Sequence, residues 1–279
     1  MLIMESRAQC ENLPGAAIVP TMGALHAGHA SLIRRAAQQH ATVVVSIYVN
    51  PTQFGETEDF STYPRTLEAD VRLANEAGAT AVLVPSADMI YPEGFEVAKR
   101  QANAWPLPPC ATRPRLEDAA RPGHFGGVCQ VVARLFDLCK PCAAYFGEKD
   151  FQQLRVITQM VEADHNRWGE LRIVSCATMR DADGLAISSR NCSLSADRRG
   201  TALGVFRALQ SAANESNPAM AERRMRETLT SHGFEIDYAV VRDAQTLLPV
   251  RDLREPCRAL IAARLPEVRL IDNMALQSG

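Results

Sequence analysis

Residues 16–49 read AAIVPTMGALHAGHASLIRRAAQQHATVVVSIYV and contain the parts of one βαβ unit. They predict a short strand over residues 16–19, an amphipathic helix over residues 31–40 and a second strand over residues 42–49. The second strand is rich in β-branched residues, which is typical of a strand buried on both faces. Two such strands joined by a helix pair in parallel, so this stretch predicts an α/β fold.

The same alternation of elements continues to about residue 177. The further elements expected are, in chain order, a helix at 67–77, a strand at 80–84, a helix at 128–139, a strand at 143–146, a helix at 150–163 and a strand at 171–175. In the first of these helices, Leu67, Val71, Ala74 and Ala77 line one face, and Gly78 closes it. The pattern predicts a Rossmann-like, doubly wound parallel sheet.

The pattern changes after about residue 177. Two helices and three closely connected strands are predicted there, at residues 201–214, 218–231, 234–241, 258–264 and 268–272. A chain of 279 residues, at roughly 150 residues per domain, suggests about two domains. We therefore predict a Rossmann-like domain over residues 1–177 and a smaller C-terminal α+β domain over residues 178–279. The proline-rich and basic region between residues 96 and 118 predicts a long loop or lid over the carboxyl edge of the sheet.

The composition excludes several classes of protein. Apolar residues make up 47% and charged residues 22% of the chain, which excludes a disordered or collagen-like protein. Thirty basic and 32 acidic side chains give a net charge of −2, which argues against a nucleic-acid partner. No segment has the ~20 mostly apolar residues of a membrane span, and the first residues do not resemble a secretory signal. A cytoplasmic protein is therefore expected.

The eight cysteines are too few for a disulfide scaffold, so reduced thiols are expected. Cys139 and Cys142 have the spacing of a redox or zinc pair, but no second ligand pair occurs at similar spacing. Apolar residues recur at helical spacing over residues 128–139, and Pro141 follows as a stop. Packing at a helix end is therefore favoured over a metal or redox site.

Two histidines lie in the turn between the first strand and the first helix. In a doubly wound sheet, this is where a ligand phosphate meets a helix N-terminus. Gly23 and Gly28 permit close backbone approach, and His26 and His29 are three residues apart, so both rings face one side of a helical first turn. Two imidazole N–H donors there suit a charged phosphoryl group. Two ordinary histidines in a turn, or a metal pair that lacks its third ligand, are the alternatives.

Residues 20–29, PTMGALHAGH, resemble the opening motif of the pantoate–β-alanine ligase family, which belongs to the HxGH nucleotidyltransferase superfamily. The further segments that resemble this family are VNPTQFG at 49–55, DFSTYPR at 59–65, RPGHFGGV at 121–128, YFGEKDFQQL at 145–154 and RDADGLAISSRN at 180–191. Each alone has an ordinary explanation. Gln53 would be a surface residue in an Asn-Pro turn, Lys149 would belong to a solvated helix N-terminus, and Ser193 would cap the next helix. The order and spacing of the motifs over most of residues 15–200 favour the family.

The resemblance implies ATP-dependent condensation of (R)-pantoate with β-alanine, through a pantoyl-adenylate intermediate, to pantothenate, AMP and pyrophosphate. The pantoate carboxylate is already an anion, so catalysis is expected to rest on positioning and charge stabilisation. Mg2+ is expected to arrive on the ATP phosphates, without a dedicated set of protein ligands. The family is typically a homodimer.

The resemblance also implies roles for residues. His29 is the implied proton donor at the leaving group, and His26, Lys149, Ser188 and Arg190 surround the phosphates. The residues implied in ATP binding are Met22, Gly23, Ala24, Leu25, His26, Ala27, Gly28, His29, Gly147, Glu148, Lys149, Asp150, Met179, Ile187, Ser188, Ser189 and Arg190.

Two glutamines are the implied substrate ligands. Gln53 and Gln153 are expected to hold pantoate, with Gln53 also next to β-alanine, and Asp70 and His124 are weaker site candidates. A generic adenylyl- or cytidylyltransferase is the alternative enzyme. A nucleotide-binding regulator without turnover is the alternative from another class, and the presence of Lys149, Ser188 and Arg190 favours an enzyme over it.

Overall fold

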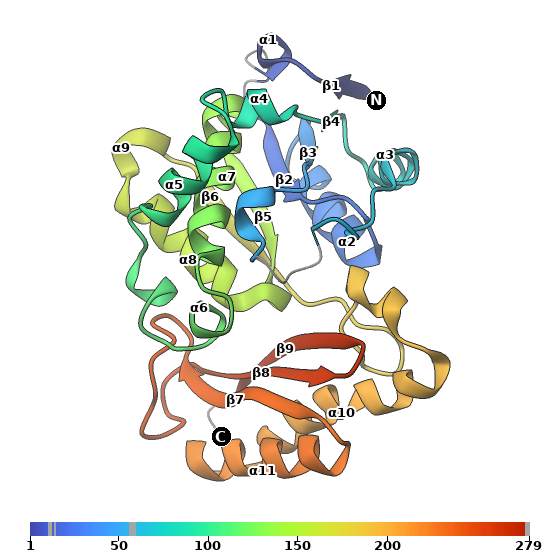
Figure 1. Cartoon of the computed structure of the whole chain (residues 1–279), viewed down its shortest axis with the longest axis vertical. Helices are drawn as coiled ribbons and strands as arrows, with labels where there is room; N and C mark the ends of the chain where they lie inside the picture. The colour runs from blue at the N-terminus through green and yellow to red at the C-terminus, as the bar shows by residue number, and fades with distance from the viewer. Residues whose placement is uncertain (11–12, 14, 56–59, 277–279) are drawn as a thin grey trace.

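The computed structural model describes residues 1–10, 13, 15–55 and 60–276, without the side chains of residues 192, 193 and 196. In this part of the chain, a six-stranded sheet has the order β1-β4-β3-β2-β5-β6, and its neighbouring strands pair in parallel (Figure 1). The strands are β1 (Leu2–Met4), β2 (Ala17–Thr21), β3 (Val43–Ile47), β4 (Ala81–Leu83), β5 (Ala143–Gly147) and β6 (Arg172–Cys176). The predicted parallel sheet is confirmed.

The order of the strands reverses next to β2. β3 and β4 lie on one side of β2, whereas β5 lies on its other side. In doubly wound sheets, such a reversal opens a crevice at the carboxyl ends of the strands, and ligands bind there. β2 ends at Thr21 and β5 ends at Gly147, so the turns after these two strands border the crevice.

Helices cover both faces of this sheet. α2 (Ala27–Ala37) and α3 (Leu67–Glu76) cover one face, and α5 (Phe95–Asn103), α7 (His124–Cys139) and α8 (Phe151–Ala163) cover the other (Figure 1). The shorter helices and turns of the same unit are α1 (Arg7–Cys10), η1 (Pro51–Gln53), α4 (Ala87–Ile90), η2 (Pro109–Ala111), α6 (Glu117–Ala120), η3 (Glu148–Asp150) and α9 (His165–Trp168).

The smaller unit contains an antiparallel sheet of β7 (Glu235–Asp243), β8 (Cys257–Leu265) and β9 (Val268–Leu276). α10 (Ala196–Ala212) and α11 (Pro218–Ser231) cover one face of it, and its other face packs against the first unit (Figure 1). β8 is therefore buried at every position except that of an arginine near its end. The expected α+β unit is confirmed, and the division at residue 177, just after β6, stays a prediction.

Two glycines explain how α7 is positioned. A Cβ atom on Gly126 would collide with the carbonyl group of Ala102 in α5, and one on Gly127 would collide with the backbone of Thr52 in η1. Both obstacles are main-chain atoms, so a side chain would force these elements apart. α7 begins at His124 and not at residue 128, because these glycines serve close packing inside a helix and do not interrupt it.

The prediction of an irregular lid between residues 96 and 118 is wrong for its first part. α5 occupies this part and buries Ala98 and Ala102 in the core that it shares with α7. The buried face of α5 carries alanines, which give a weak apolar signal in the sequence. The segment is therefore a packed layer beside the sheet.

Two further expectations are corrected. Leu67, expected on the apolar face of α3, is 43% exposed, and the buried residue of that turn is Asp70. α10 begins five residues earlier than predicted, because the Oγ atom of Ser195 caps it by accepting from the backbone N–H of Arg198 at 3.3 Å. Among the described helices, none is both long enough and apolar enough to cross a membrane.

Candidate active site

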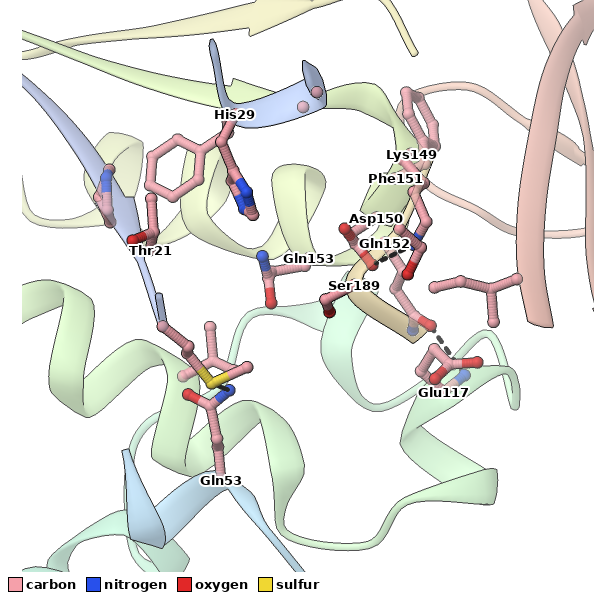
Figure 2. Close-up of a pocket in the computed structure, with 18 of the residues that line it drawn as sticks. Thr21, His29, Gln53, Glu117, Lys149, Asp150, Phe151, Gln152, Gln153 and Ser189 are labelled. Carbon is pink, nitrogen blue, oxygen red and sulfur yellow. Dashed lines mark hydrogen bonds and ion pairs between the residues drawn. The ribbon is translucent and has the colours of Figure 1, made fainter. Parts of the chain in front are cut away.

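A pocket lies at the carboxyl ends of β2 and β5, and the second sheet forms its opposite wall. The residues assigned from the sequence that line it are Met22, His26, Gly28, His29, Gln53, His124, Gly147, Lys149, Asp150, Gln153, Met179, Ile187, Ser188, Ser189 and Arg190. Figure 2 shows several of them, from both sides of the crevice, around one space. The assigned residues outside its lining are Gly23, Ala24, Leu25, Ala27, Glu148 and Asp70. The structure therefore brings together most of the implied site.

The two histidines cap α2 reciprocally. His26 is the N-cap residue, and its Nδ1 accepts from the backbone N–H of Gly28 at 3.1 Å. The Nδ1 of His29 accepts from the backbone N–H of His26 at 3.3 Å, and the two rings stack with centroids 4.0 Å apart. Because both Nδ1 atoms are acceptors, the neutral rings carry their protons on Nε2. Each ring thus keeps an N–H donor for a ligand.

Both rings are neutral at pH 7. Burial, with a contribution from the charge of Lys149, lowers the pKa of His26 to about 4. Burial also lowers the pKa of His29 to about 3, and the neighbouring His26 contributes to this shift. The pair therefore supplies hydrogen-bond donors without positive charge.

Lowering the pH from 7 to 4 is expected to destabilise the fold through these histidines. Unfolding restores their ordinary pKa of 6.5, so the unfolded chain takes up protons in a range where the folded rings stay neutral. Their stabilising contribution is complete above pH 6.5 and is lost as the pH falls toward the folded-state values, by up to about 1.4 kcal/mol per pH unit for each ring. Urea unfolding of the wild type and of His26→Gln from pH 7 to 4 measures this. An equal pH dependence in both proteins would contradict it.

Asp70 holds the turn between β2 and α2 from outside the pocket. Its carboxylate, on a residue 2% exposed, accepts from the backbone N–H groups of Ala24 at 3.0 Å and Leu25 at 2.8 Å. The hydroxyl of Thr66 donates to it at 3.0 Å. Gly23 has a φ of +81°, and a Cβ there would lie 3.0 Å from the same carboxylate. Asp70 is therefore a positioning residue for the histidine turn.

We expect Asp70→Asn to lower the free energy of unfolding by about 1–3 kcal/mol, because an amide N–H2 would face a buried backbone N–H. Asp88→Asn, at an exposed carboxylate of α4, is the matched control and should stay within about 0.5 kcal/mol of the wild type. Urea titration of the three proteins checks this. An equal loss in both variants would show that Asp70 has no special part in the turn.

A buried network orients Gln53. Asn50 is fully buried, and its Nδ2 donates at 3.1 Å to both the Oε1 of Gln53 and the carbonyl oxygen of Gly127. The Oδ1 of Asn50 accepts from the hydroxyl of Tyr91 at 2.6 Å. The Nε2 of Gln53 lies 2.9 Å from the sulfur of Met22 (Figure 2). The protein thus holds the Gln53 oxygen, and the Nε2 donates one N–H to Met22 and keeps a second N–H that can donate to a ligand.

His124 links this network to Arg121. The Nδ1 of His124 lies 2.9 Å from the carbonyl oxygen of Gln53, which can only accept, so Nδ1 carries the proton. The Nε2 therefore accepts from the guanidinium of Arg121, which lies 3.0 Å away and lines the pocket. Arg121 stood in a quoted motif but was not assigned to the site. The sequence signal that could have identified Arg121 is its place as a basic residue just before the glycine-rich start of a helix.

The second sheet supports the turn that carries Lys149. The Nζ of Lys149 lies 3.4 Å from the Oδ1 of Asp150, and both residues line the pocket (Figure 2). Burial favours protonation of Asp150, but Lys149 and the charge of Arg190 outweigh it and hold its pKa below the ordinary value. Glu148 instead pairs with Arg258 of β8 at 2.6 Å. Its side chain therefore joins the two units and does not line the pocket.

Adjacent glutamines of α8 have different surroundings. Gln152 is 3% exposed, accepts from the backbone N–H of Glu117 at 2.9 Å and donates to the carbonyl oxygen of Cys110 at 2.9 Å. The amide of Gln153 points into the middle of the pocket (Figure 2). Gln152 is therefore a structural residue, and Gln153 is placed to contact a ligand.

Residues of segment 180–190 form the wall that faces the histidine turn. Ser188 caps η4 (Ser189–Ser193), since its Oγ accepts from the backbone N–H of Arg190 at 3.3 Å. Ser195 is the N-cap residue of α10, and the side chain of Ser193 lies outside the described part of the chain. Ser188, Ser189 and Arg190 all line the pocket.

Some residues of the second sheet line the pocket and were not predicted from the sequence. They are Tyr238, Leu260, Ile261, Ile271, Asp272 and Asn273. Asp272 and Asn273 are adjacent buried polar residues in an otherwise apolar part of β9. Two polar residues side by side in such a strand were the available signal.

In the described part of the chain, no group of three or more histidine, cysteine, aspartate or glutamate side chains is arranged to hold a metal ion. The described cysteines form no disulfide bond with one another. Cys139, the last residue of α7, is 2% exposed, which agrees with packing at a helix end.

Both units of the chain are similar to proteins of one family. A family model described as Pantoate-beta-alanine ligase matches residues 3–275. The pantothenate synthetase of Rubrobacter xylanophilus is 47% identical, and the match covers 93% of this chain and 90% of that protein. The crystal structure of pantothenate synthetase from Thermus thermophilus has a TM-score of 0.88 at 40% identity, with 98% of this chain and 99% of that one covered.

A third similar protein has bound ligands. The pantoate-beta-alanine ligase of Francisella tularensis, in complex with beta-gamma ATP and beta-alanine, has a TM-score of 0.78 at 31% identity. The match covers 100% of this chain and 99% of that one. The similarity therefore includes the pocket and both of its walls.

Proposed function

Because the chain belongs to the pantoate–β-alanine ligase family, we propose that the pocket between β2 and β5 is where it performs the reaction of this family. The enzyme condenses (R)-pantoate with β-alanine, using ATP, through a pantoyl-adenylate intermediate. The observation that carries the assignment to this pocket is the meeting of two neutral Nε2–H donors, from His26 and His29, with Lys149 across the crevice.

In the first step, the pantoate carboxylate attacks the α-phosphorus of ATP, and the bond to pyrophosphate breaks. This nucleophile is already an anion, so the rate depends on positioning and on stabilisation of charge at the phosphates. We assign His26, His29 and Lys149 to the phosphate oxygens. Because His29 is neutral at pH 7, its contribution at the leaving group is a hydrogen bond from Nε2–H.

The wall formed by residues 187–190 is assigned to the leaving pyrophosphate and the nucleotide. Ser188, Ser189 and Arg190 offer two hydroxyls and a guanidinium, which can follow the phosphates as they separate. Met179 and Ile187 border the nucleotide. The turns at residues 22–28 and 147–150 contribute their main-chain groups.

Gln53 and Gln153 are assigned to pantoate. The Gln53 amide is fixed with one N–H left for a ligand, and the Gln153 amide points into the pocket, so both can donate to a carboxylate or hydroxyl. In the second step, the amine of β-alanine attacks the acyl carbon next to Gln53. AMP leaves, and the amine loses a proton as the amide forms.

Magnesium fits the pocket as an ion carried by ATP. Mg2+ typically keeps water and substrate oxygens as ligands and needs few protein groups. Asp150, an ionised carboxylate in the pocket lining, is the acceptor assigned to the hydrated ion. When bound, the ion neutralises charge on the phosphates.

A homodimer in the cytoplasm is part of the same proposal. The cytoplasm is proposed because the cysteine content of the sequence is too low for a disulfide scaffold, and the dimer follows from the usual assembly of the family. Sedimentation velocity of the purified chain tests the dimer. A single monomeric boundary at micromolar concentration would oppose it.

Exchange of labelled pyrophosphate into ATP, with pantoate present and β-alanine absent, tests the proposed function. An acyl-adenylate mechanism predicts exchange that requires both pantoate and Mg2+. A nucleotide-binding regulator predicts none. Equal exchange without any hydroxy acid would support a generic nucleotidyltransferase.

Gln153→Ala is expected to lower kcat/KM for pantoate by about 10- to 100-fold, because a hydrogen bond to a charged group contributes about 1.5–3 kcal/mol. The Kd of ATP for the free enzyme should change little. Steady-state kinetics and a binding titration measure the two quantities. Gln159→Ala, on the same helix outside the pocket lining, is the matched control. Equal weakening of both substrates would place Gln153 elsewhere.

A further inference from the structure

Two adjacent residues of β9 contact both phosphate-binding segments of the pocket. Asp272 is 5% exposed and Asn273 is 4% exposed, in the middle of the strand. Successive residues of a strand point to opposite faces, so the two side chains leave the sheet on different sides. Asn273 reaches the turn that carries Lys149, and Asp272 reaches the base of the loop that carries Ser188 and Arg190.

Asn273 holds the turn that carries Lys149. Its Nδ2 donates to the carbonyl oxygens of Glu148 and Lys149, both at 2.8 Å. The N-cap residues of η3 and α8 make no side-chain cap of their own, so this amide stabilises the turn from outside. The Oδ1 of Asn273 is buried and has no hydrogen-bond partner among the described residues. The two hydrogen bonds that Nδ2 donates therefore orient the side-chain amide, while the Oδ1 atom accepts no hydrogen bond from the described residues.

Asp272 holds the loop on the other face. Its carboxylate accepts from both terminal nitrogens of Arg180, at 2.6 and 2.9 Å, and from the backbone N–H of Asn273 at 2.8 Å. Arg180 also donates to the carbonyl oxygen of Gly184 at 3.1 Å. Its backbone pairs with that of Ala186 in an isolated antiparallel β-bridge. Arg180 thus closes the base of the loop that leads to the phosphate-binding serines.

We infer that Asp272 and Asn273 are positioning residues for adenylyl transfer, which set the separation between Lys149 and the Ser188–Arg190 wall. The inference rests on the proposed function. A strand held by hydrogen bonds on both faces is a rigid spacer. Preorganised donors act in the reaction only at the correct separation, and a displacement of about 1 Å can cost about 10²-fold in rate.

The test measures both half-reactions in Asn273→Ala and Asp272→Asn. In both variants, kcat for pantoyl-adenylate formation should fall about 10- to 100-fold, while KM for pantoate changes less than about threefold. The conversion of supplied pantoyl adenylate with β-alanine should stay within about threefold of the wild type, because this step does not involve the pyrophosphate. Asn273→Gln keeps the two donors and should recover part of the lost rate.

Asn217→Ala is the control for a merely structural effect. This asparagine caps α11 through a bond from the backbone N–H of Met220 at 2.9 Å, outside the pocket lining. The control should lower the melting temperature and leave both half-reactions unchanged.

Three results would overturn the inference: equal slowing of both half-reactions, wild-type adenylation in a folded Asn273→Ala, or failure of both variants to fold. Absence of pantoate-dependent exchange in the wild type would instead overturn the proposed function.

Discussion

Replacing Lys149 with methionine is expected to slow pantoyl-adenylate formation by about 10²–10³-fold while the chain stays folded. Methionine keeps the apolar stem and removes the ammonium group, which we assign to the ATP phosphates from the β5 side of the crevice. The ammonium is available to a ligand, because its nearest acidic partner, Asp150, lies 3.4 Å away and the side chain of Lys149 is 20% exposed.

Rapid-quench measurement of the first turnover checks this prediction. Lys99→Met, at an exposed position of α5, is the matched control and should keep the wild-type rate. The conversion of supplied pantoyl adenylate by Lys149→Met should be impaired far less than its formation. A variant equally slow in both half-reactions would assign Lys149 to the architecture of the pocket.

His29→Ala is expected to slow pantoyl-adenylate formation by a similar factor, about 10²–10³. It should also lose stability, because the Nδ1 of His29 accepts from the backbone N–H of His26 at the start of α2. The two effects belong to different nitrogen atoms of one ring. A second substitution separates them.

Glutamine at the third residue of a helix is a usual partner in a capping box. His29→Gln should therefore recover much of the melting temperature lost in His29→Ala and little of the rate. The wild-type rate should show no inflection near pH 6.5 from this residue, since the pKa of His29 is lowered to about 3. Wild-type turnover in His29→Ala, or full recovery of the rate by glutamine, would contradict the assigned role.

The parallel sheet and the histidine turn were predictable because their signals are local. Runs of β-branched residues give the strands, and the His-x-Gly-His spacing follows one strand directly and opens a helix. The position of the turn on the sheet then brings it to the crevice. The tautomers and the lowered pKa values of the two rings depend on burial and on hydrogen bonds that only the folded chain supplies.

The roles of Glu148 and Asn273 could not be predicted, because they depend on contacts between segments that lie far apart in the sequence. Glu148 lies in a motif that implies nucleotide binding, yet its carboxylate pairs with Arg258, 110 positions away. Nothing in the local sequence distinguishes a carboxylate of the pocket from one that joins two units. Asn273 reaches Lys149 over a similar distance, 124 positions. The alanines of α5 were missed for a different reason, because small residues give little periodic signal.

The covering of the second sheet on both faces has a thermodynamic consequence. Separating it from the first unit would expose the apolar residues of one face, such as Tyr238, Val240 and Leu260, to water. The two units are therefore expected to unfold cooperatively, in a single transition. Both units contribute walls to the pocket, so a substrate that binds there stabilises the entire chain by mass action. Occupancy of the pocket should then raise one common melting temperature.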